Sequence, residues 1–195
     1  MSRIVIVQGH PDGSTKHYCH ALAEAYQRGA EDGGHHVDVI DLGKTEVSIL
    51  RSKVEWESDE DLPEFVVDAQ RLIEKSDHLV FIYPLWLGSM PALVKAWIEQ
   101  VLRASFAFSI VANGKGWEAK LGGRTARVVV TMGMPALVYR LFYFSHSLRS
   151  LERNILKFAG VKPVRSTIIG SIESKDGGAR KTWLEKMEAW GRGCR

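Results

Sequence analysis

Three short segments of the chain carry residue types that can hold a charged or aromatic ligand. Residues 9–17 contain two glycines, two hydroxyl side chains, a lysine and two histidines. Residues 84–90 read Pro-Leu-Trp-Leu-Gly-Ser-Met, and residues 131–135 read Thr-Met-Gly-Met-Pro. Each segment follows a short apolar run, which predicts a loop at the end of a strand buried on both faces.

The first segment has the donors that a phosphate group needs. Ser14 and Thr15 supply hydroxyls, Lys16 supplies a positive charge, and the helix expected next supplies N–H groups at its amino end. The alternative is a surface turn in which Ser14 or Thr15 caps that helix. The spacing matches neither GxGxxG nor GxxxxGKS/T, so these residues form neither a dinucleotide fingerprint nor a P-loop.

Three histidines and a cysteine in this region raise the question of a metal site. His10, His17, Cys19 and His20 are metal-ligating types, but Cys19 and His20 are adjacent and would point in different directions on a helix. No HxxxH pair places two of the histidines on one helix face. We therefore expect no metal, and favour a histidine that donates to a phosphate or packs beside it.

Strand and helix patterns alternate along the whole chain. The predicted strands are 4–7, 36–42, 78–83, 126–131 and 164–172. The predicted helices are 18–29, 65–75, 91–102, 137–143, 147–158 and 183–190. This alternation predicts one α/β domain over residues 1–195, a doubly wound five-stranded parallel sheet in the order 2-1-3-4-5 with helices on both faces. In that order the first, third and fourth strands are neighbours, so the three loops meet at one edge of the sheet.

The tryptophan of the second loop is the residue on which a ligand hypothesis depends most. A lone Trp86 would be interpreted as a core residue, but here it stands between a strand and a helix that starts at a proline. Trp86 can cover one face of a planar ring, while the backbone N–H groups of Leu87 and Gly88 can reach ring heteroatoms. Gly88 and Gly133 leave room for a close backbone approach. A phosphate at the first loop and a ring between the other two describe a flavin mononucleotide.

Asp41 is a further candidate for ligand binding, because it lies at the end of the second predicted strand. In dinucleotide-binding folds an acidic residue at that place accepts hydrogen bonds from ribose hydroxyls. The glycine fingerprint that accompanies such a residue is absent from this chain. The sequence alone therefore gives a ribose-binding Asp41 little support.

Bulk composition limits the function classes. The chain has 195 residues, 45% of them hydrophobic, and a formal net charge of +3. No run of lysines and arginines with interleaved aromatics is present, so we do not expect nucleic acid as a partner. Cys19 and Cys194 lie near opposite ends and form no disulfide framework, which is typical of a reducing compartment. With no apolar run of membrane-spanning length, we expect a soluble, cytoplasmic protein.

Five motifs taken together point to a known family: residues 9–11 (Gly-His-Pro), 83–92 (Tyr-Pro-Leu-Trp-Leu-Gly-Ser-Met-Pro-Ala), Lys95, 106–108 (Phe-Ala-Phe) and 131–133 (Thr-Met-Gly). In these the chain resembles the flavodoxin-like NAD(P)H:quinone oxidoreductases, which include DT-diaphorase, the modulator of drug activity B and the ancillary oxidoreductases of glutathione-gated potassium efflux systems. The resemblance covers nearly the whole chain. It implies a flavodoxin-like fold, bound FMN or FAD, a homodimer with active sites at the subunit boundary, and ping-pong two-electron reduction of quinones by NAD(P)H.

The resemblance also implies roles for individual residues. In DT-diaphorase a tyrosine and a histidine downstream of the third loop assist hydride transfer, and Tyr139 and His146 stand at or near the matching positions. The alternative for both is packing and helix capping. The predicted cofactor-binding residues are His10, Ser14, Lys16 and His17 for the phosphate, Pro84, Leu85, Trp86, Leu87 and Gly88 for the ring, and Thr131, Met132 and Gly133 for the opposite wall.

The chain departs from the family pattern in its first loop, which is longer and lacks the usual Ser-Phe-Asn. The third loop also departs, because residues 132–135 (Met-Gly-Met-Pro) stand where Thr-Gly-Gly is usual, and this more apolar wall leaves FMN and FAD both open. NADH and NADPH stay open as well. Two other functions also stay open, namely an electron carrier with no substrate of its own and a regulatory flavoprotein subunit of a membrane transport system. Carriers of this fold are typically strongly acidic, which this chain is not, whereas the acidic segment around Trp56 offers a surface for a protein partner.

Overall fold

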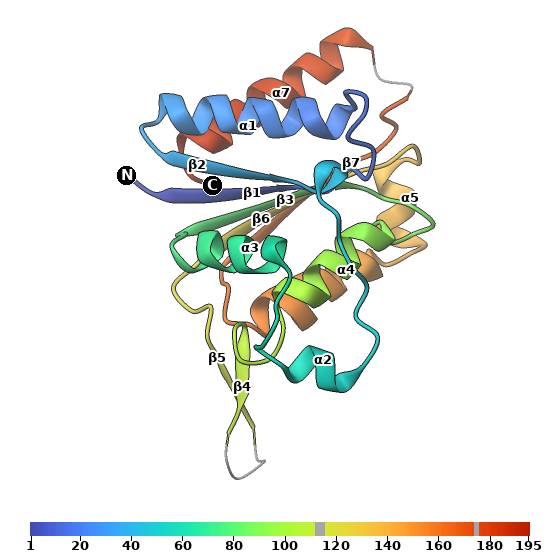
Figure 1. Ribbon diagram of the computed structural model, residues 1–195. Helices are drawn as coiled ribbons and strands as arrows, with labels where there is room; N and C mark the ends of the chain where they lie inside the picture. The colour runs from blue at the N-terminus through green and yellow to red at the C-terminus, as the bar shows by residue number, and fades with distance from the viewer. Residues whose placement is uncertain (112–115, 174–175) are drawn as a thin grey trace.

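Five parallel strands form the central sheet of the structure, a computed structural model that describes residues 1–111, 116–173 and 176–195. The strands are β1 (Arg3–Gln8), β2 (His36–Asp41), β3 (His78–Pro84), β6 (Thr125–Thr131) and β7 (Val164–Ile169), in the order β2-β1-β3-β6-β7 (Figure 1). Numbered within this sheet alone, that is the order 2-1-3-4-5. It confirms the predicted doubly wound, flavodoxin-like α/β fold.

The strand register brings the three predicted loops to one edge of the sheet. Gln8 pairs with Ile82, and Pro84 pairs with Thr131. β1, β3 and β6 therefore end side by side, and the segments that leave their carboxyl ends are neighbours. β3 is buried along its full length, as expected of a central parallel strand that is covered on both faces.

Helices cover both faces of the sheet (Figure 1). α1 (Tyr18–Asp32) and α7 (Gly177–Arg192) lie together on one face, and Ile4 and Ile6 of β1 pack into that layer. Val5 and Val7 pack against the other layer, because side chains alternate along a strand. This other layer consists of α3 (Glu64–Glu74), α4 (Ala92–Val101), α5 (Ala136–Leu141), α6 (His146–Arg149) and the π-helix η2 (Ser150–Lys157). In the described part of the chain, no helix is both long and apolar enough to cross a membrane.

Two glycines allow α1 and α7 to lie unusually close together. A Cβ added to Gly29 of α1 would lie 2.0 Å from the backbone oxygen of Glu188. A Cβ added to Gly191 of α7 would lie 2.1 Å from the backbone oxygen of Tyr26. Both distances are far below a carbon–oxygen contact, so no residue with a side chain fits at either position without moving a helix.

Some elements differ from those predicted. α7 begins at Gly177 rather than at residue 183, because the Asp176 side chain accepts a 2.7 Å hydrogen bond from Ala179 N and caps the helix there. β7 ends at Ile169, earlier than the predicted residue 172. The segment predicted as one helix over 147–158 is α6 followed by η2. Four short elements were not predicted: η1 (Leu42–Lys44), α2 (Lys53–Glu57), β4 (Phe108–Ile110) and β5 (Trp117–Ala119).

The hairpin of β4 and β5 projects from the body of the molecule (Figure 1). Aromatic side chains pack it against the body, because the Phe158 ring lies 4.9 Å from that of Phe108 and 4.8 Å from that of Trp117. Strands this short carry too little alternation to be recognised in a sequence.

Candidate functional site

The three loops at the carboxyl edge of the sheet contact one another. Gly9 N donates to Ile82 O at 2.7 Å and ties the first loop to the end of β3. Leu85 N donates to Thr131 O at 2.7 Å and ties the second loop to the third. Cys19 of α1 joins this set, because its Sγ lies 3.2 Å from Thr131 Oγ1. These bonds bring the segments that carry the predicted cofactor-binding residues to one place.

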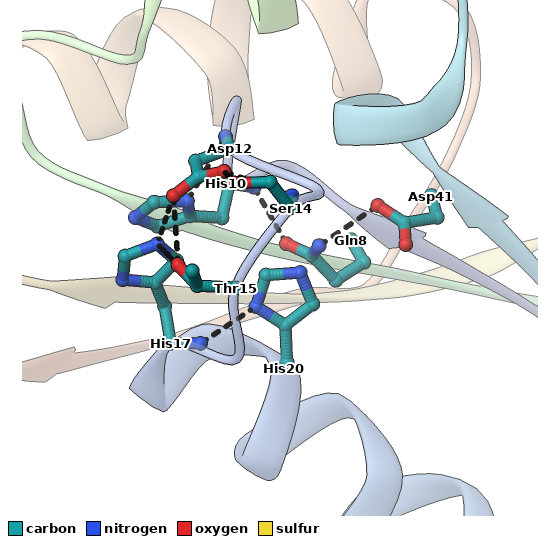
Figure 2. A network of polar contacts seen from close by, with 8 residues as sticks. All are labelled: Gln8, His10, Asp12, Ser14, Thr15, His17, His20 and Asp41. Atoms are coloured by element: carbon teal, nitrogen blue, oxygen red, sulfur yellow. Dashed lines mark hydrogen bonds and ion pairs between the residues drawn. The ribbon is translucent and has the colours of Figure 1, made fainter.

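Loop 9–17 is organised around the carboxylate of Asp12, as Figure 2 shows. Ser14 donates to Asp12 Oδ1 twice, from its N–H at 2.8 Å and from its hydroxyl at 2.5 Å. Thr15 Oγ1 donates to Asp12 Oδ2 at 2.8 Å, and His17 Nε2 donates to the same oxygen at 2.7 Å. These donors, the Ser14 hydroxyl first among them, hold the pKa of Asp12 well below its usual range. The side chains of Ser14 and His17 are therefore engaged by a carboxylate of their own loop.

The backbone of the same loop keeps donors free for a ligand. Among the residues that the structure describes, the N–H groups of Thr15, Lys16, Tyr18 and Cys19 make no hydrogen bond. Tyr18 and Cys19 begin α1, and the first N–H groups of a helix have no partner within it. The Lys16 ammonium pairs with Glu24 at 2.8 Å on the surface. An anion at this place would meet free N–H groups and the positive end of the helix dipole, which is an arrangement that suits a phosphate.

His10, His17 and His20 form a cluster of imidazoles beside these N–H groups. The rings of His10 and His17 stack with their centroids 3.8 Å apart, and His20 Nδ1 accepts a 3.1 Å hydrogen bond from His17 N. Burial lowers the pKa of His10 and the nearby His17 lowers it further, so His10 is neutral at pH 7. Its Nδ1 accepts from Asp12 N at 3.2 Å, which leaves the proton on Nε2 as a donor. Within the described residues, no group of three or more His, Cys, Asp or Glu is arranged to hold a metal ion.

Loop 84–90 presents Trp86 and Leu87 to solvent, while Leu85 and Met90 pack into the core. Trp86 is 48% exposed, and Leu87 is fully exposed. Leu87 and Gly88 have φ angles of 47° and 76°, and Trp86 and Ser89 exchange backbone hydrogen bonds of 2.8 and 2.9 Å across this turn. The His10 ring lies 6.0 Å from the Trp86 ring and meets it edge-on. Trp86 is thus no core residue, and its exposed indole lies next to the first loop.

The third loop contributes one open position and two buried ones. Thr131 and Met132 are 1% and 2% exposed, and Met132 N donates to Ile169 O at 2.9 Å. Gly133 is exposed, and a Cβ added to it would lie 3.5 Å from Glu173 Oε1. Thr131 and Met132 therefore fix the loop in place, while the backbone of Gly133 is the part that a ligand could approach.

The two residues predicted to take part in catalysis lie in different environments. Tyr139 is fully buried, and its hydroxyl accepts a 3.3 Å hydrogen bond from Leu148 N. Burial raises its pKa. His146 is exposed, and its Nδ1 donates to the backbone oxygen of Tyr143 at 2.8 Å. Tyr143 is the tyrosine that borders the second loop, because a Cβ added to Gly88 would lie 3.8 Å from its ring.

The site therefore includes residues that the sequence did not single out. Asp12 had a recognisable signal, because an Asp two residues before a Ser favours a turn in which the Asp side chain accepts backbone N–H groups. Tyr143 lay in the predicted helix 137–143, where nothing separates it from Tyr139 without knowledge of the facing loop. Glu173 carries no local signal, and Cys19 was considered only as a metal ligand, since each reaches the third loop only through the tertiary fold.

The chain matches the model of the flavodoxin-like fold family over residues 2–190. An uncharacterised NAD(P)H oxidoreductase of Haemophilus influenzae is 25% identical over 184 residues, which is 93% of this chain and 90% of that protein. The solved NAD(P)H:quinone oxidoreductase of Methanothermobacter marburgensis is 25% identical, with a TM-score of 0.80 over 99% of this chain and 96% of that one.

A shorter match is to the glutathione-regulated potassium-efflux system ancillary protein KefG of Cronobacter sakazakii. It is 37% identical over 81 residues. Those residues cover 40% of this chain and 41% of that protein, so the match spans less than half of that relative's length.

Proposed function

The chain belongs to the flavodoxin-like fold family, and from this premise we propose that it is a flavin-dependent NAD(P)H oxidoreductase that reduces quinones or similar electrophiles. One observation carries the proposal. At one edge of the sheet, the loop whose free N–H groups can bind a phosphate lies next to an exposed tryptophan. His10 and Trp86, one from each loop, have ring centroids 6.0 Å apart. The Haemophilus and Methanothermobacter relatives, named as NAD(P)H oxidoreductases, support the same reaction class.

The residues at this edge fit a flavin, which supplies two-electron redox chemistry when bound. The free N–H groups of loop 9–17 and of the first turn of α1 would hold its phosphate, with His10 Nε2 as a further donor. Residues 84–88 would hold the ring on one side and Gly133 on the other. We propose FMN as the cofactor, because this phosphate site accounts for the monophosphate, and keep FAD as the alternative.

The protein's own share of the reaction is binding, exclusion of water and placement of protons. The Trp86 indole and the Leu87 side chain would cover an apolar ring face and keep water from it. The His146 Nδ1–H donates a hydrogen bond to Tyr143 O, so its Nε2 is the ring nitrogen left free for a substrate or a proton relay. We keep Tyr139 and His146 as the predicted catalytic pair, and add Tyr143 because it borders the second loop. The ping-pong order, in which NAD(P)H and the electrophile use the same face in turn, remains part of the proposal.

Anaerobic rapid mixing of the purified yellow protein with NADPH tests the proposal. We expect fast loss of the visible absorbance on mixing with NADPH or NADH, and its return on addition of a quinone. A protein that binds neither FMN nor FAD on reconstitution would contradict the cofactor assignment. A yellow protein that neither nicotinamide nucleotide bleaches would instead favour an electron carrier.

We also propose a homodimer in which each active site is completed by the partner. Five large apolar side chains near Tyr143 are exposed by 44 to 75%, and they lie on α5 and the turn after it. An apolar surface of this kind beside the exposed Leu87 is typical of a protein interface. The five exposed side chains of this surface are Leu137, Val138, Leu141, Phe142 and Phe144. Light scattering should give twice the chain mass, and Phe142→Glu should give a monomer of lower activity.

The match to KefG raises a membrane transport system as a second partner class, and a cytoplasmic location would suit both roles. The acidic segment around Trp56 was the candidate surface for such a partner. Part of it is fixed, because Arg103 Nη1 donates to the backbone oxygens of Glu55 and Ser58 at 2.9 and 3.1 Å. Trp56 itself lies with its ring 5.8 Å from that of Phe108. Co-purification with a membrane fraction, and its loss in Trp56→Ala, would support this partner.

A further inference from the structure

A cavity of about 300 Å³ borders loop 9–17 on the side of β2, and it shares residues 13–16 with the loop proposed to hold the flavin phosphate. Its walls come from loop 9–17, from the first turns of α1, and from the end of β2 with η1. No residue of loops 84–90 or 131–135 lines it. Its volume is at the lower end of the range for small-molecule sites. It therefore requires an explanation separate from that of the flavin ring.

The floor of this cavity is a built polar arrangement. Gln8 is 2% exposed, and its amide accepts from His10 N at 2.5 Å and donates to Asp41 Oδ1 at 3.0 Å (Figure 2). Gly43 N donates to the same Asp41 oxygen at 3.1 Å. The carboxylate of Asp41 is thus held in one orientation by two donors, which leaves its Oδ2 for other partners.

Two segments that form the walls are locked together, so the cavity does not depend on a flexible gap. A Cβ added to Gly13 of loop 9–17 would lie 2.6 Å from Gly43 O, and one added to Gly43 would lie 2.5 Å from Gly13 N. The backbones of the two segments therefore touch directly. This contact fixes the distance between Asp41 and the loop that would hold a phosphate.

Donors face the cavity from the other sides. His20 Nδ1 accepts from His17 N, which places the imidazole proton on Nε2, and His20 lines the cavity with no other hydrogen-bond partner among the described residues. Lys44 Nζ lies 3.3 Å from Asp41 Oδ2, and Lys16 Nζ lies 2.8 Å from Glu24. Both lysine side chains are at least 70% exposed, so these ion pairs are weak and can be exchanged for a ligand.

The charges around the cavity decide which ligand suits it. Lys16 and Lys44 balance Glu24 and Asp41, so an anion without hydroxyl groups gains little net attraction. A ligand with a hydroxyl pair and an attached phosphate matches both signs, because hydroxyls donate to Asp41 while the phosphate accepts from the lysines and His20. An acidic residue at the end of the second strand of a parallel sheet is a known position for contact with ribose.

We propose that this cavity binds the ribose phosphate of an adenine nucleotide. Asp41 accepts the ribose hydroxyls, and Lys16, Lys44 and His20 face the phosphate. The cavity adjoins loop 9–17, so the nucleotide can be the adenosine end of the nicotinamide co-substrate, the adenosine half of FAD, or a free nucleotide. The shared chemistry is the same in all three, and the experiment separates them.

Calorimetric titration of the purified, FMN-loaded protein with adenosine 5′-monophosphate is the direct test. We expect saturable binding that Asp41→Asn weakens about tenfold, because a hydroxyl–carboxylate hydrogen bond is lost. 2′,3′-Dideoxyadenosine 5′-monophosphate should bind weakly and respond little to Asp41→Asn. Asp38→Asn is the matched control, since Asp38 lies on the same strand outside the cavity and should bind like the wild type.

Lys44→Gln guards against a loss of folding in Asp41→Asn, because Lys44 is on the rim and supports no buried bond. We expect Lys44→Gln to weaken binding of adenosine 5′-monophosphate about threefold at low salt and less at high salt. Wild-type affinity in both variants, or no binding by any nucleotide at millimolar concentration, would overturn the proposal. Visible absorbance in the same samples reports flavin occupancy, so a failure here is distinguishable from a failure of the flavin assignment.

Competition assigns the source of the nucleotide once binding is observed. If the monophosphate raises the KM for NADPH, the cavity holds the adenosine end of the co-substrate. If it displaces FAD but leaves FMN bound, the cavity holds the adenosine half of the cofactor. If it does neither, the ligand is a free nucleotide. Each of these three results supports the ribose-phosphate site.

Discussion

The two ends of the sheet carry similar polar residues in opposite circumstances. At the carboxyl end, the stacked His10 and His17 lie beside backbone N–H groups that have no partner among the described residues. At the amino end, His78 is 2% exposed, with its Nδ1 2.6 Å from Thr125 Oγ1 and its ring stacked on Tyr26 at 6.4 Å. A histidine alone thus says little about function. What separates the two ends is whether the surrounding backbone and aromatic groups are free.

A buried cation strengthens the contrast. Arg127 at the amino end is 5% exposed, and it lies 3.9 Å over the Trp190 ring. Its Nη1 donates to Thr167 Oγ1 at 3.1 Å, so its charge is used in packing α7 onto the sheet. Lys16 at the carboxyl end is 81% exposed and held only by a surface ion pair. Changes at the amino end should therefore affect stability, and changes at the carboxyl end should affect ligand binding.

The largest expected effect is on stability, at the close contact of α1 and α7. Gly29→Ala would place a methyl group 2.0 Å from Glu188 O, so the helices must separate. We expect a loss of about 3 kcal/mol in the free energy of unfolding, measured by urea denaturation. The flavin affinity of the folded protein should be unchanged, because Gly29 lies far along α1 from the loop.

Gly177→Ala is the matched control for this change. Gly177 is the first residue of α7, and an added Cβ would meet nothing within 4 Å. Alanine there should be neutral or slightly stabilising. If Gly29→Ala were as stable as Gly177→Ala, the packing assigned to the amino end would be wrong.

The next effect is on the cofactor, at the carboxyl end. Trp86→Ala should raise the dissociation constant for FMN about 30-fold, because a large aromatic contact with the ring is lost. Fluorescence titration measures it, and the urea midpoint should hardly change because Trp86 is 48% exposed. Trp117→Ala is the control, because Trp117 is similarly exposed, at 54%, but lies in the hairpin, where it stacks on Phe158. Full flavin occupancy in Trp86→Ala would break the distinction between the two ends.

Much of this arrangement follows from local patterns in the sequence. The apolar runs before residues 9, 84 and 131 predict buried strands, and the alternation with helices limits the sheet to few topologies. The confirmed strand order then brings the loops together without any motif. Positions such as Gly9 and Trp86 were recognisable because a strand, a loop and a helix follow one another there.

The rest depends on contacts between segments that are far apart in sequence. The Ser14 and His17 side chains looked like phosphate ligands, yet they bond Asp12, which competes for the same donors. Asp41 had little support as a ribose ligand from the sequence, because only the fold places it beside a cavity. Tyr139 lies on the buried face of α5, which is too short for its sequence to show a period, whereas Tyr143 follows α5 in a turn and is half-buried.

His78 allows a test of the amino end by pH. Burial lowers its pKa to about 4, whereas the unfolded chain titrates near its ordinary 6.5. Between these values the unfolded state binds a proton that the folded state does not, so stability falls as the pH falls through this window. We expect about 2 kcal/mol less stability at pH 5 than at pH 7 from this group.

His78→Asn should remove that part of the pH dependence, because asparagine can still accept from Thr125 but does not titrate. His36→Asn is the control, since the His36 side chain is 49% exposed at the start of β2. Urea denaturation at pH 5 and 7 measures both variants. An unchanged pH slope in His78→Asn would mean that His78 contributes nothing to acid sensitivity.

The smallest expected effect concerns the histidine at the other end, His10, and the direction of its proton. In the free protein its pKa is lowered by burial and by His17, with a smaller contribution from His20, while Asp12 raises it. A phosphate dianion nearby favours the imidazolium, so His10 should take up part of a proton when FMN binds. Between pH 8 and pH 7 the affinity of the protein for FMN should therefore rise about threefold. Calorimetry in buffers of different ionisation enthalpy measures the uptake directly. Riboflavin, which lacks the phosphate, should show none, and neither should His10→Asn with FMN. Equal uptake with riboflavin would place the titrating group at the ring, and the carboxyl-end histidines would then be as structural as His78.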